Sequence, residues 1–328
     1  MNLYVSHMSA MRYWRQSEGL ATSLRTKARS LANAMPSVKD ARKLRPREHG
    51  LIMSEQCPLD VLVGNKDVRR YATEFRPHLW TGDVPVHAFR KIAPSLYIST
   101  PEFVFLQLAP LFSVEELAQI GNELCGGYYL LGKGGFKEHE DLRTLTTRAK
   151  LAEFVSRMHG ARGTARARQA LRWVADNCNS PQETNSLLAL CLPRRRGGWS
   201  LFMPEVNKSV SVGKRLARYV GGETYTPDFM WERTVGGKVL RITGEYDSHE
   251  HHDEDSAAEK TRIRRNDMKA MGYLVTSINR SQLRRASEFR YPARQIARDL
   301  GLYRPVPDEE TLSRQDELLT LLRRERFR

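Results

Sequence analysis

The sequence predicts a mixed α/β protein, and two observations support this class. Short apolar runs with strand-like composition alternate with segments that carry helix-capping residues at their starts. Within residues 180–300 the predicted elements follow the order α-β-β-β-α-β-α, an arrangement in which helices cover a sheet. The chain has 328 residues, a length more typical of two domains than of one.

An N-terminal α/β domain is expected over residues 1–130. Ser6 is a suitable cap for the first helix, and Ser113 with Glu116 forms a capping box before a later one. Apolar, β-branched runs predict the strands. The predicted elements are a helix over His7–Gln16, strands over Leu59–Val63, Val84–His87 and Leu96–Ser99, and helices that begin after Thr100 and after Ser113.

The rest of the chain divides into three predicted parts: a helical connector over residues 131–179, a second domain over 180–305 and a charged C-terminal helix within 306–328. In the connector, Thr147–Asn177 is predicted to be helical. In the second domain, Val235-Gly236-Gly237 predicts a tight hairpin. The predicted elements of that domain are a helix from Ser180 to Cys191, strands over Phe202–Val210, Thr226–Trp231, Lys238–Asp247 and Tyr273–Ile278, and helices over Ser256–Met271 and Ser281–Leu300.

Composition limits the classes of function. No run of about 18 apolar residues exists, and the first residues lack the pattern of a secretory signal, so we expect a cytoplasmic protein without a membrane partner. The four cysteines have no metal-binding spacing and are expected to be reduced thiols. The formal net charge of +15 favours a nucleic-acid partner through counterion release, although a merely basic protein has the same composition.

Two acidic residues are brought together by the predicted hairpin. Asp228 lies at the start of its first strand and Glu245 near the end of its second, and antiparallel pairing places these two ends side by side. Two carboxylates at short range repel each other unless a cation or a proton joins them. A hard divalent cation suits such oxygen ligands, and Mg²⁺ is the usual one where phosphate is the substrate. Asp228 and Glu245 are therefore predicted metal ligands, with Mg²⁺ as the cofactor.

Four segments of this region, in order, resemble one nuclease family. They are Ser180-Pro181-Gln182-Glu183 at a helix start, Asp228-Phe229 followed by Trp231, Glu245-Tyr246-Asp247 followed by His251-His252, and Gly272-Tyr273 before the last strand. The set is similar to the PD-(D/E)xK superfamily, and within it to small endonuclease-like domains related to very-short-patch-repair endonucleases. The resemblance implies a restriction-endonuclease-like α-β-β-β-α-β core and metal-dependent cleavage of DNA.

The N-terminal region resembles a second family. Leu59–Val63, Val84–His87 and the helix start Ser99-Thr100-Pro101-Glu102-Phe103 are similar to the C-terminal domain of AbiEi-type antitoxin proteins. Those domains often precede an endonuclease-like domain in one chain. The resemblance implies a link to toxin–antitoxin systems.

Further residues are candidates for the catalytic site, each with an alternative explanation. A capping box explains Glu183, and the resemblance also directs it towards the metal site. Asp247 shares a strand face with Glu245, or serves as a turn residue. The resemblance places His252 or its neighbour His251 near the scissile phosphate, as a proton donor or phosphate ligand; the alternative is a solvated polar loop.

A cation beside the carboxylates is expected from the helix that follows them. Arg264 matches the position that the resembling family uses, and Lys260 is the second candidate. Either residue would stabilise the negative charge of the phosphate transition state, or else pack its aliphatic part on the sheet. Other basic residues are candidates for phosphate-backbone contacts, with solvated surface charge as the alternative: Arg194, Arg195, Arg196, Arg262, Arg265 and Lys269.

The sequence thus predicts a DNA endonuclease in which Mg²⁺, held by Asp228, Glu245 and a backbone carbonyl, activates water for phosphodiester hydrolysis. The alternative is a non-catalytic DNA-binding regulator of antitoxin type on a nuclease fold, and a third class is a protein-interaction scaffold. Salt-dependent DNA binding without metal-dependent nicking would favour the regulator. The kind of nucleic acid and any protein partner stay open at this point.

Overall fold

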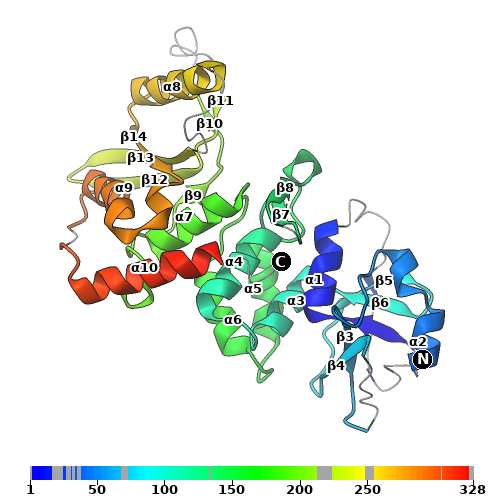
Figure 1. The fold of residues 1–328 in the computed structure, drawn as a ribbon. Coiled ribbons are helices and arrows are strands. Elements are labelled where there is room, and N and C mark those ends of the chain that lie inside the picture. The colour runs from blue at the N-terminus through cyan, green and yellow to red at the C-terminus, as the bar shows by residue number, and fades with distance from the viewer. Residues whose placement is uncertain are drawn as a thin grey trace. The chain divides into compact units, whose positions relative to one another are not determined.

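The computed structural model describes residues 2–16, 25–26, 31, 34, 38–67, 73–132, 134–212, 224–247, 255–303 and 305–324 (Figure 1). Helices and several sheets are present, so the predicted α/β class is confirmed at this level. Contacts divide the chain into two compact units, Met1–Cys125 with Tyr129–Val174, and Gly126–Tyr128 with Ala175–Arg326. None of the helices in the described ranges has the length and apolar character needed to cross a membrane.

A six-stranded mixed sheet forms the centre of the first unit, in the order β2-β5-β6-β1-β3-β4. Two of its strands, β1 and β3, are apolar runs that are buried at every position, as central strands covered on both faces are. β1 pairs with β6 in parallel and with β3 in antiparallel fashion. The strands are β1 (Leu3–Val5), β2 (Arg25–Thr26), β3 (Leu59–Val63), β4 (Phe75–Leu79), β5 (Phe89–Ala93) and β6 (Leu96–Ser99).

Helices α1 (His7–Gln16) and α3 (Pro101–Leu108) supply much of the core of this unit. α1 buries Met11 and Trp14, and every residue of α3 is buried. α4 (Val114–Leu124) begins with the predicted capping box. The other elements before the second sheet are α2 (Val38–Lys43), η1 (Pro46–His49), β7 (Tyr128–Leu130), β8 (Phe136–Glu138), η2 (Glu140–Leu142), α5 (Arg148–Arg157), α6 (Thr164–Ala170) and η3 (Leu171–Trp173).

Two predictions for this part of the chain are wrong. Val84–His87 forms a turn region rather than a strand, because Pro85 lacks an amide donor and His87 has a left-handed backbone with φ 65°. The helix predicted over Thr147–Asn177 is divided into α5, α6 and η3, with left-handed glycines between α5 and α6. By its contacts most of the predicted connector belongs to the first unit; the division of the chain into four functional parts stays a prediction.

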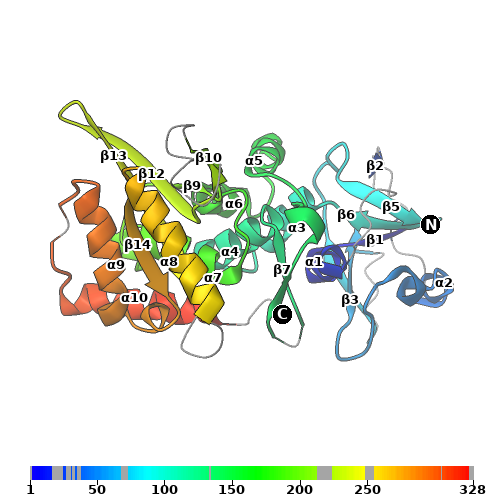
Figure 2. The same ribbon diagram turned by 90° about the horizontal axis from the view of Figure 1, so that it is seen from above.

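The second unit is built around a four-stranded sheet in the order β14-β13-β12-β9 (Figure 2). β12 and β13 form the predicted hairpin, and Gly236 and Gly237 at its turn both have positive φ, 56° and 78°, as a tight two-residue turn requires. β13 pairs in parallel with β14, so the chain crosses over between them through α8. The strands are β9 (Glu205–Val206), β12 (Phe229–Val235), β13 (Lys238–Asp247) and β14 (Leu274–Asn279).

Helices cover both faces of this sheet (Figure 1). α8 (Asp255–Ala270) lies on one face, where Met268 packs with Met230 and Tyr273. Helices α7 (Pro181–Cys191), α9 (Ala286–Asp299) and α10 (Glu309–Arg323) lie on the other side. The shorter elements of this unit are η4 (Arg194–Arg196), β10 (Val210–Ser211), β11 (Thr224–Tyr225) and η5 (Gln282–Arg284).

The helices and the strands of the four-stranded sheet follow one another as α7-β9-β12-β13-α8-β14-α9, the predicted order, but β10 and β11 stand between β9 and β12 and several bounds differ. The strand predicted over Phe202–Val210 is confined to β9 and the start of β10. The strand predicted from Thr226 begins at Phe229, which leaves Asp228 immediately before it. The side chains of 255–261 and 264 in α8 lie outside the described residues.

Candidate functional site

The two predicted metal ligands lie at one end of the β12–β13 hairpin. In the antiparallel register Phe229 pairs with Gly244, so Asp228 and Glu245 are the next opposed positions along the two chain segments. Glu245 is buried, with 9% of its surface exposed, whereas Asp228 is half-buried. The predicted antiparallel hairpin, and with it the adjacency of these positions, is confirmed. Their role as metal ligands stays a prediction.

Backbone contacts hold Asp228 in place. Its Oδ2 accepts a hydrogen bond from the amide of Tyr246 at 2.6 Å. Its carbonyl oxygen accepts a hydrogen bond from the amide of Asn207 at 3.1 Å. The first of these contacts directs the carboxylate towards the end of β13, the strand that carries Glu245.

Glu183 joins the site from the first turn of α7. The Ser180 hydroxyl accepts a hydrogen bond from the Glu183 amide at 3.1 Å and donates one to Oε1 at 2.9 Å, so the helix start is capped as predicted. Burial, and next the charge of Asp228, raise the pKa of Glu183 to about 7, and hydrogen bonds from Asn179, Asn207 and Ser180 offset only part of this shift. Glu183 and Asp228 are therefore close enough to influence each other's charge.

Asn207 connects these two acids, and it is absent from the sequence-based candidates. Its side-chain amide donates to Oε2 of Glu183 at 2.7 Å and to the carbonyl of Asn177 at 2.8 Å, while its backbone amide holds Asp228. Its φ of 45° lies in the left-handed region, which Asn adopts more readily than most residues. In the sequence, only this backbone preference could have pointed to a structural role for Asn207, because its contact partners are distant along the chain.

Arg265 of α8 provides a positive charge at the same end of the sheet. Its Nη2 donates to Oδ2 of Asp247 at 2.7 Å, and the two side chains are 29% and 24% exposed. Asp247 follows Glu245 by two residues and therefore shares its strand face. Arg265, a candidate for phosphate contacts or for solvated surface charge, is in an ion pair with a candidate site residue.

Three predicted catalytic residues cannot be placed at side-chain level. Lys260 and Arg264 lie in α8, but their side chains are outside the described residues, and so is the whole of His252. Among the residues predicted for phosphate contacts, Arg194 donates from Nη2 to the carbonyl of Pro305 at 3.2 Å. The roles expected for these residues stay predictions.

The donor chemistry at the hairpin end fits a hard cation. Asp228 and Glu245 offer carboxylate oxygens from opposed positions, and Mg²⁺ commonly takes one or two carboxylates from the protein while water and phosphate complete its shell. Within the described residues, no group of three or more His, Cys, Asp or Glu side chains is arranged to hold a metal.

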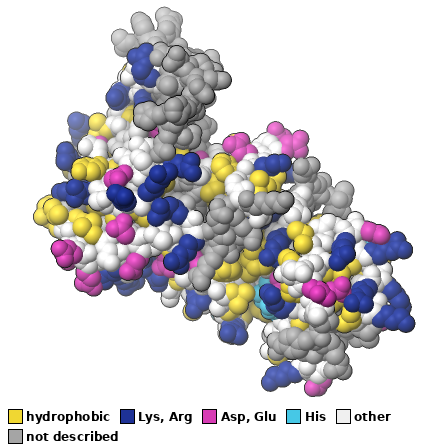
Figure 3. Space-filling view, viewed as in Figure 1, with side chains coloured by type: hydrophobic (Ala, Val, Ile, Leu, Met, Phe, Trp, Pro, Cys, Tyr) yellow, Lys and Arg dark blue, Asp and Glu magenta, His cyan; other side chains and the backbone are white. Residues whose placement is uncertain are grey.

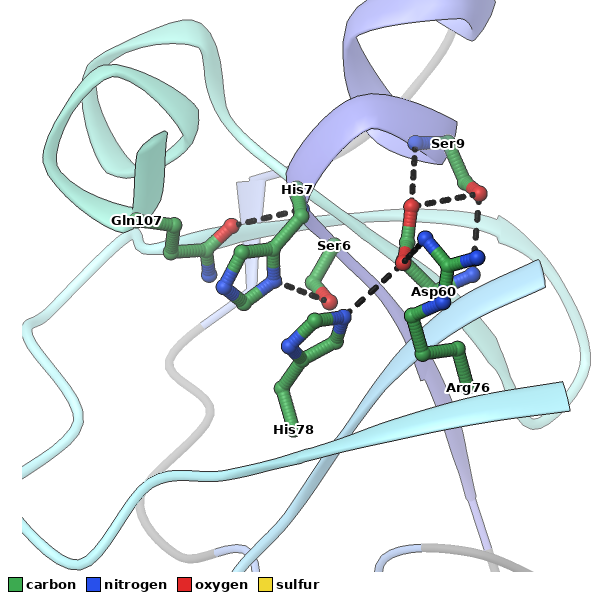
Figure 4. Close-up of polar contacts among 7 residues, drawn as sticks. All are labelled: Ser6, His7, Ser9, Asp60, Arg76, His78 and Gln107. Carbon is green, nitrogen blue, oxygen red and sulfur yellow. Dashed lines mark hydrogen bonds and ion pairs between the residues drawn. The ribbon is translucent and has the colours of Figure 1, made fainter. Parts of the chain in front are cut away.

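A second polar cluster lies in the first unit and was not foreseen from the sequence (Figure 4). Asp60 of β3 accepts hydrogen bonds at Oδ2 from the amide and hydroxyl of Ser9, both at 3.1 Å, and so caps the start of α1. Nε2 of His78 lies 2.8 Å from the other oxygen, Oδ1. Arg76, whose side chain is 59% exposed, stands 3.8 Å from the same carboxylate.

The rings of His7 and His78 stack in this cluster, with centroids 3.7 Å apart and planes at 20° (Figure 4). Burial, and then the nearby His78, lower the pKa of His7 to about 3, against the opposite effect of Asp60. Burial raises the pKa of Asp60, but the hydrogen bond and charge of His78, with His7 and Arg76, lower it overall. These contacts join α1 to the sheet, and we interpret the cluster as a structural one.

Comparison with known proteins gives no match: no family model, no curated protein and no solved structure corresponds to this chain. The geometry of the described residues is therefore the basis for assigning a function. It brings together Asp228 and Glu245 by strand register, and Glu183 and Asp228 by proximity.

Proposed function

We propose that the protein is a metal-dependent endonuclease of the PD-(D/E)xK type, which hydrolyses phosphodiester bonds in DNA. One observation carries the proposal: Asp228, just before β12, lies opposite Glu245 of β13 in the hairpin register, and its charge reaches Glu183 of α7. The elements around them follow the α-β-β-β-α-β order of the resembling family. A restriction-endonuclease-like core is the fold that this proposal requires.

The residues of the site would have different roles in the reaction. Asp228 and Glu245 would hold Mg²⁺, which would supply Lewis acidity and lower the pKa of a bound water. The Tyr246 amide orients Asp228 before any ligand arrives, and this preorganisation limits the cost of binding. Glu183, with a pKa of about 7, has the acidity that suits proton transfer near neutral pH.

Isosteric variants test the proposal on the intact chain. Asp228→Asn retains an oxygen to accept the Tyr246 amide, and Glu245→Gln retains the shape of the buried side chain. Each variant is expected to lower Mg²⁺-dependent nicking of plasmid DNA or cleavage of labelled oligonucleotides by at least roughly 100-fold, because each removes one anionic ligand. Glu232→Gln is the matched control, since Glu232 lies in the same hairpin but is exposed and paired with Arg241.

Chelation by EDTA should abolish cleavage by the wild-type protein. The proposal is contradicted if Asp228→Asn and Glu245→Gln cleave DNA at the same rate as the control Glu232→Gln at matched thermal stability. Asp228 and Glu245 would then have no role in cleavage. The assay uses single-stranded, duplex and mismatched DNA and RNA, because the arrangement of acids does not select among them.

The second candidate is a non-catalytic DNA-binding regulator on the same fold. One observation favours it: Asp247 is already engaged in an ion pair with Arg265. Such a protein would bind DNA with strong salt dependence and would cleave none of these substrates with any divalent cation.

A further inference from the structure

A basic groove lies between the edge strand β14 and α9 in the second unit. It has a volume of about 540 Å³ and is lined by residues from both elements and from η5. None of its lining residues is acidic. Its main lining residues are Thr276, Ser277, Gln282, Arg290, Arg294 and Arg298.

The three arginines form a ladder on one side of α9. They follow one another at intervals of four residues, so they occupy neighbouring positions along one helix face, about 6 Å apart per step. From Arg290 to Arg298 the ladder extends about 12 Å. That length exceeds one phosphate group and fits a chain of successive phosphates.

The charges of this ladder are directed to solvent. Arg294 and Arg298 are exposed, and neither guanidinium has a hydrogen bond or ion pair with another described residue. Arg290 donates to the hydroxyl of Tyr291 at 3.1 Å and lies 4.9 Å from its ring centroid, and the tyrosine is 62% exposed. The acids of α9, Glu288 and Asp299, are not among the lining residues. Figure 3 shows Lys and Arg side chains spread over the face of this unit on which α9 lies.

Strand register connects the groove to the candidate site. Ser277, which lines the groove, is the register partner of Glu245 on the neighbouring strand. Adjacent strands are about 4.8 Å apart. The groove therefore borders the strand next to the one that carries Glu245, whereas Glu245 itself shares a strand face with Asp247, the partner of Arg265 of α8.

We propose that the groove between β14 and α9 binds the phosphodiester backbone of DNA through Arg290, Arg294 and Arg298. This inference rests on the proposed function, because it supplies the surface along which the strand to be cut is held. The contacts are to phosphates, so they position the strand without selecting its sequence.

Fluorescence anisotropy with labelled duplex and single-stranded DNA tests the inference, in EDTA so that no cleavage occurs. The double variant Arg294→Glu, Arg298→Glu is compared with Arg162→Glu, Arg168→Glu, which makes the same change of net charge at exposed residues of the first unit. The groove variant should bind duplex DNA more weakly by roughly tenfold per lost contact at about 0.1 M salt. The slope of log Kd against log salt should fall by about 1.8, since each lost phosphate contact removes about 0.9.

Equal affinities for the two double variants would overturn the inference. The same holds if the wild-type chain binds no DNA, or if poly-glutamate displaces DNA at equal charge concentration, since the groove would then favour acidic protein. Displacement by millimolar inorganic phosphate would also overturn it, because one phosphate would then suffice. The neutral variant Arg294→Gln, Arg298→Gln, checked by thermal melting, should show a weaker loss in the same direction and guards against misfolding of the charge-reversed protein.

These results are separable from the proposed function. If the groove variant loses DNA binding and the wild-type protein does not nick DNA, the result supports DNA binding by the groove and contradicts the proposed nuclease activity. If the groove variant binds and cleaves DNA normally while Asp228→Asn is inactive, the result supports the nuclease activity and contradicts DNA binding by the groove.

Discussion

Glu183 illustrates how a single residue serves both local structure and the candidate site. Its hydrogen bonds to Ser180 and Asn179 complete the start of α7, while its burial beside Asp228 disfavours its charged form. Groups kept under such strain are common at functional sites, where stability is exchanged for reactivity. We therefore expect removal of the Glu183 charge to stabilise the fold and to impair cleavage.

Glu183→Gln should raise the melting temperature of the second unit in EDTA by about 3 °C at neutral pH, for a gain on the order of 1 kcal/mol. The folded pKa of about 7 exceeds the ordinary value of 4.5, so the wild-type protein loses stability relative to the variant as pH rises from 4.5 towards 7. Calorimetry across this range measures the difference. Glu317→Gln, at an exposed acid of α10, should show no such trend.

His7 gives the opposite pH dependence. Its pKa in the fold, about 3, lies below the ordinary 6.5, so its contribution is present above pH 6.5 and is lost as pH falls towards 3. The loss is about 1.4 kcal/mol per pH unit within that range. Asn suits the left-handed backbone at φ 47°. His7→Asn should therefore reduce the fall in the free energy of unfolding, measured by urea melts, as pH decreases below 6.5. An unchanged fall, or an equal reduction by the exposed-residue variant His159→Asn, contradicts this assignment.

At the scale of elements, the turn after α7 depends on a close backbone approach. A Cβ added to Gly198 would lie 2.0 Å from the carbonyl oxygen of Leu192, at the end of the helix that carries Glu183. Gly198→Ala should destabilise the second unit by about 3 kcal/mol or more, because backbone must move to relieve the overlap. Thermal melting measures the loss. Gly132→Ala, where a Cβ meets nothing within 4 Å, should change stability by less than about 0.5 kcal/mol.

Elements with strong local signals could be predicted from the sequence. β3, β6 and β13 begin and end where their apolar runs and the hairpin glycines indicate, and the caps of α4 and α7 form as expected. β4, with the sequence FRPHL, was missed because an internal proline and two basic side chains hide its strand character. Val84–His87 was wrongly predicted, because sequence composition does not show the left-handed backbone of His87.

The candidate site was predictable only as far as strand pairing determines it. The opposed positions of Asp228 and Glu245 follow from the hairpin, and Glu183 from its capping sequence. The contacts of Asn207 and the ion pair between Asp247 and Arg265 depend on tertiary packing and have no local signature. The spacing of the arginines in α9 is visible in the sequence. The groove itself forms only because α9 packs beside the edge strand β14, which the sequence does not show.

At the scale of the whole molecule, the two compact units each have a sheet and a buried core of their own. We expect two thermal transitions in differential scanning calorimetry rather than one cooperative transition. Glu183→Gln should shift only one of them and His7→Asn, at acidic pH, only the other, because the residues belong to different units. A single transition that both variants shift equally, with matching calorimetric and van't Hoff enthalpies, contradicts this expectation.

The hairpin of β12 and β13 also sets a fixed distance between its turn and the candidate site. Its glycine turn and Glu245 lie at opposite ends of β13, and the eight residue steps from Gly237 to Glu245 correspond to about 27 Å in an extended strand. A fluorophore attached at the turn through an introduced cysteine would stand well away from the acids, yet within energy-transfer range of a dye on DNA held beside them. Such a labelled protein would report the arrival and departure of the strand in real time without altering the residues that hold it.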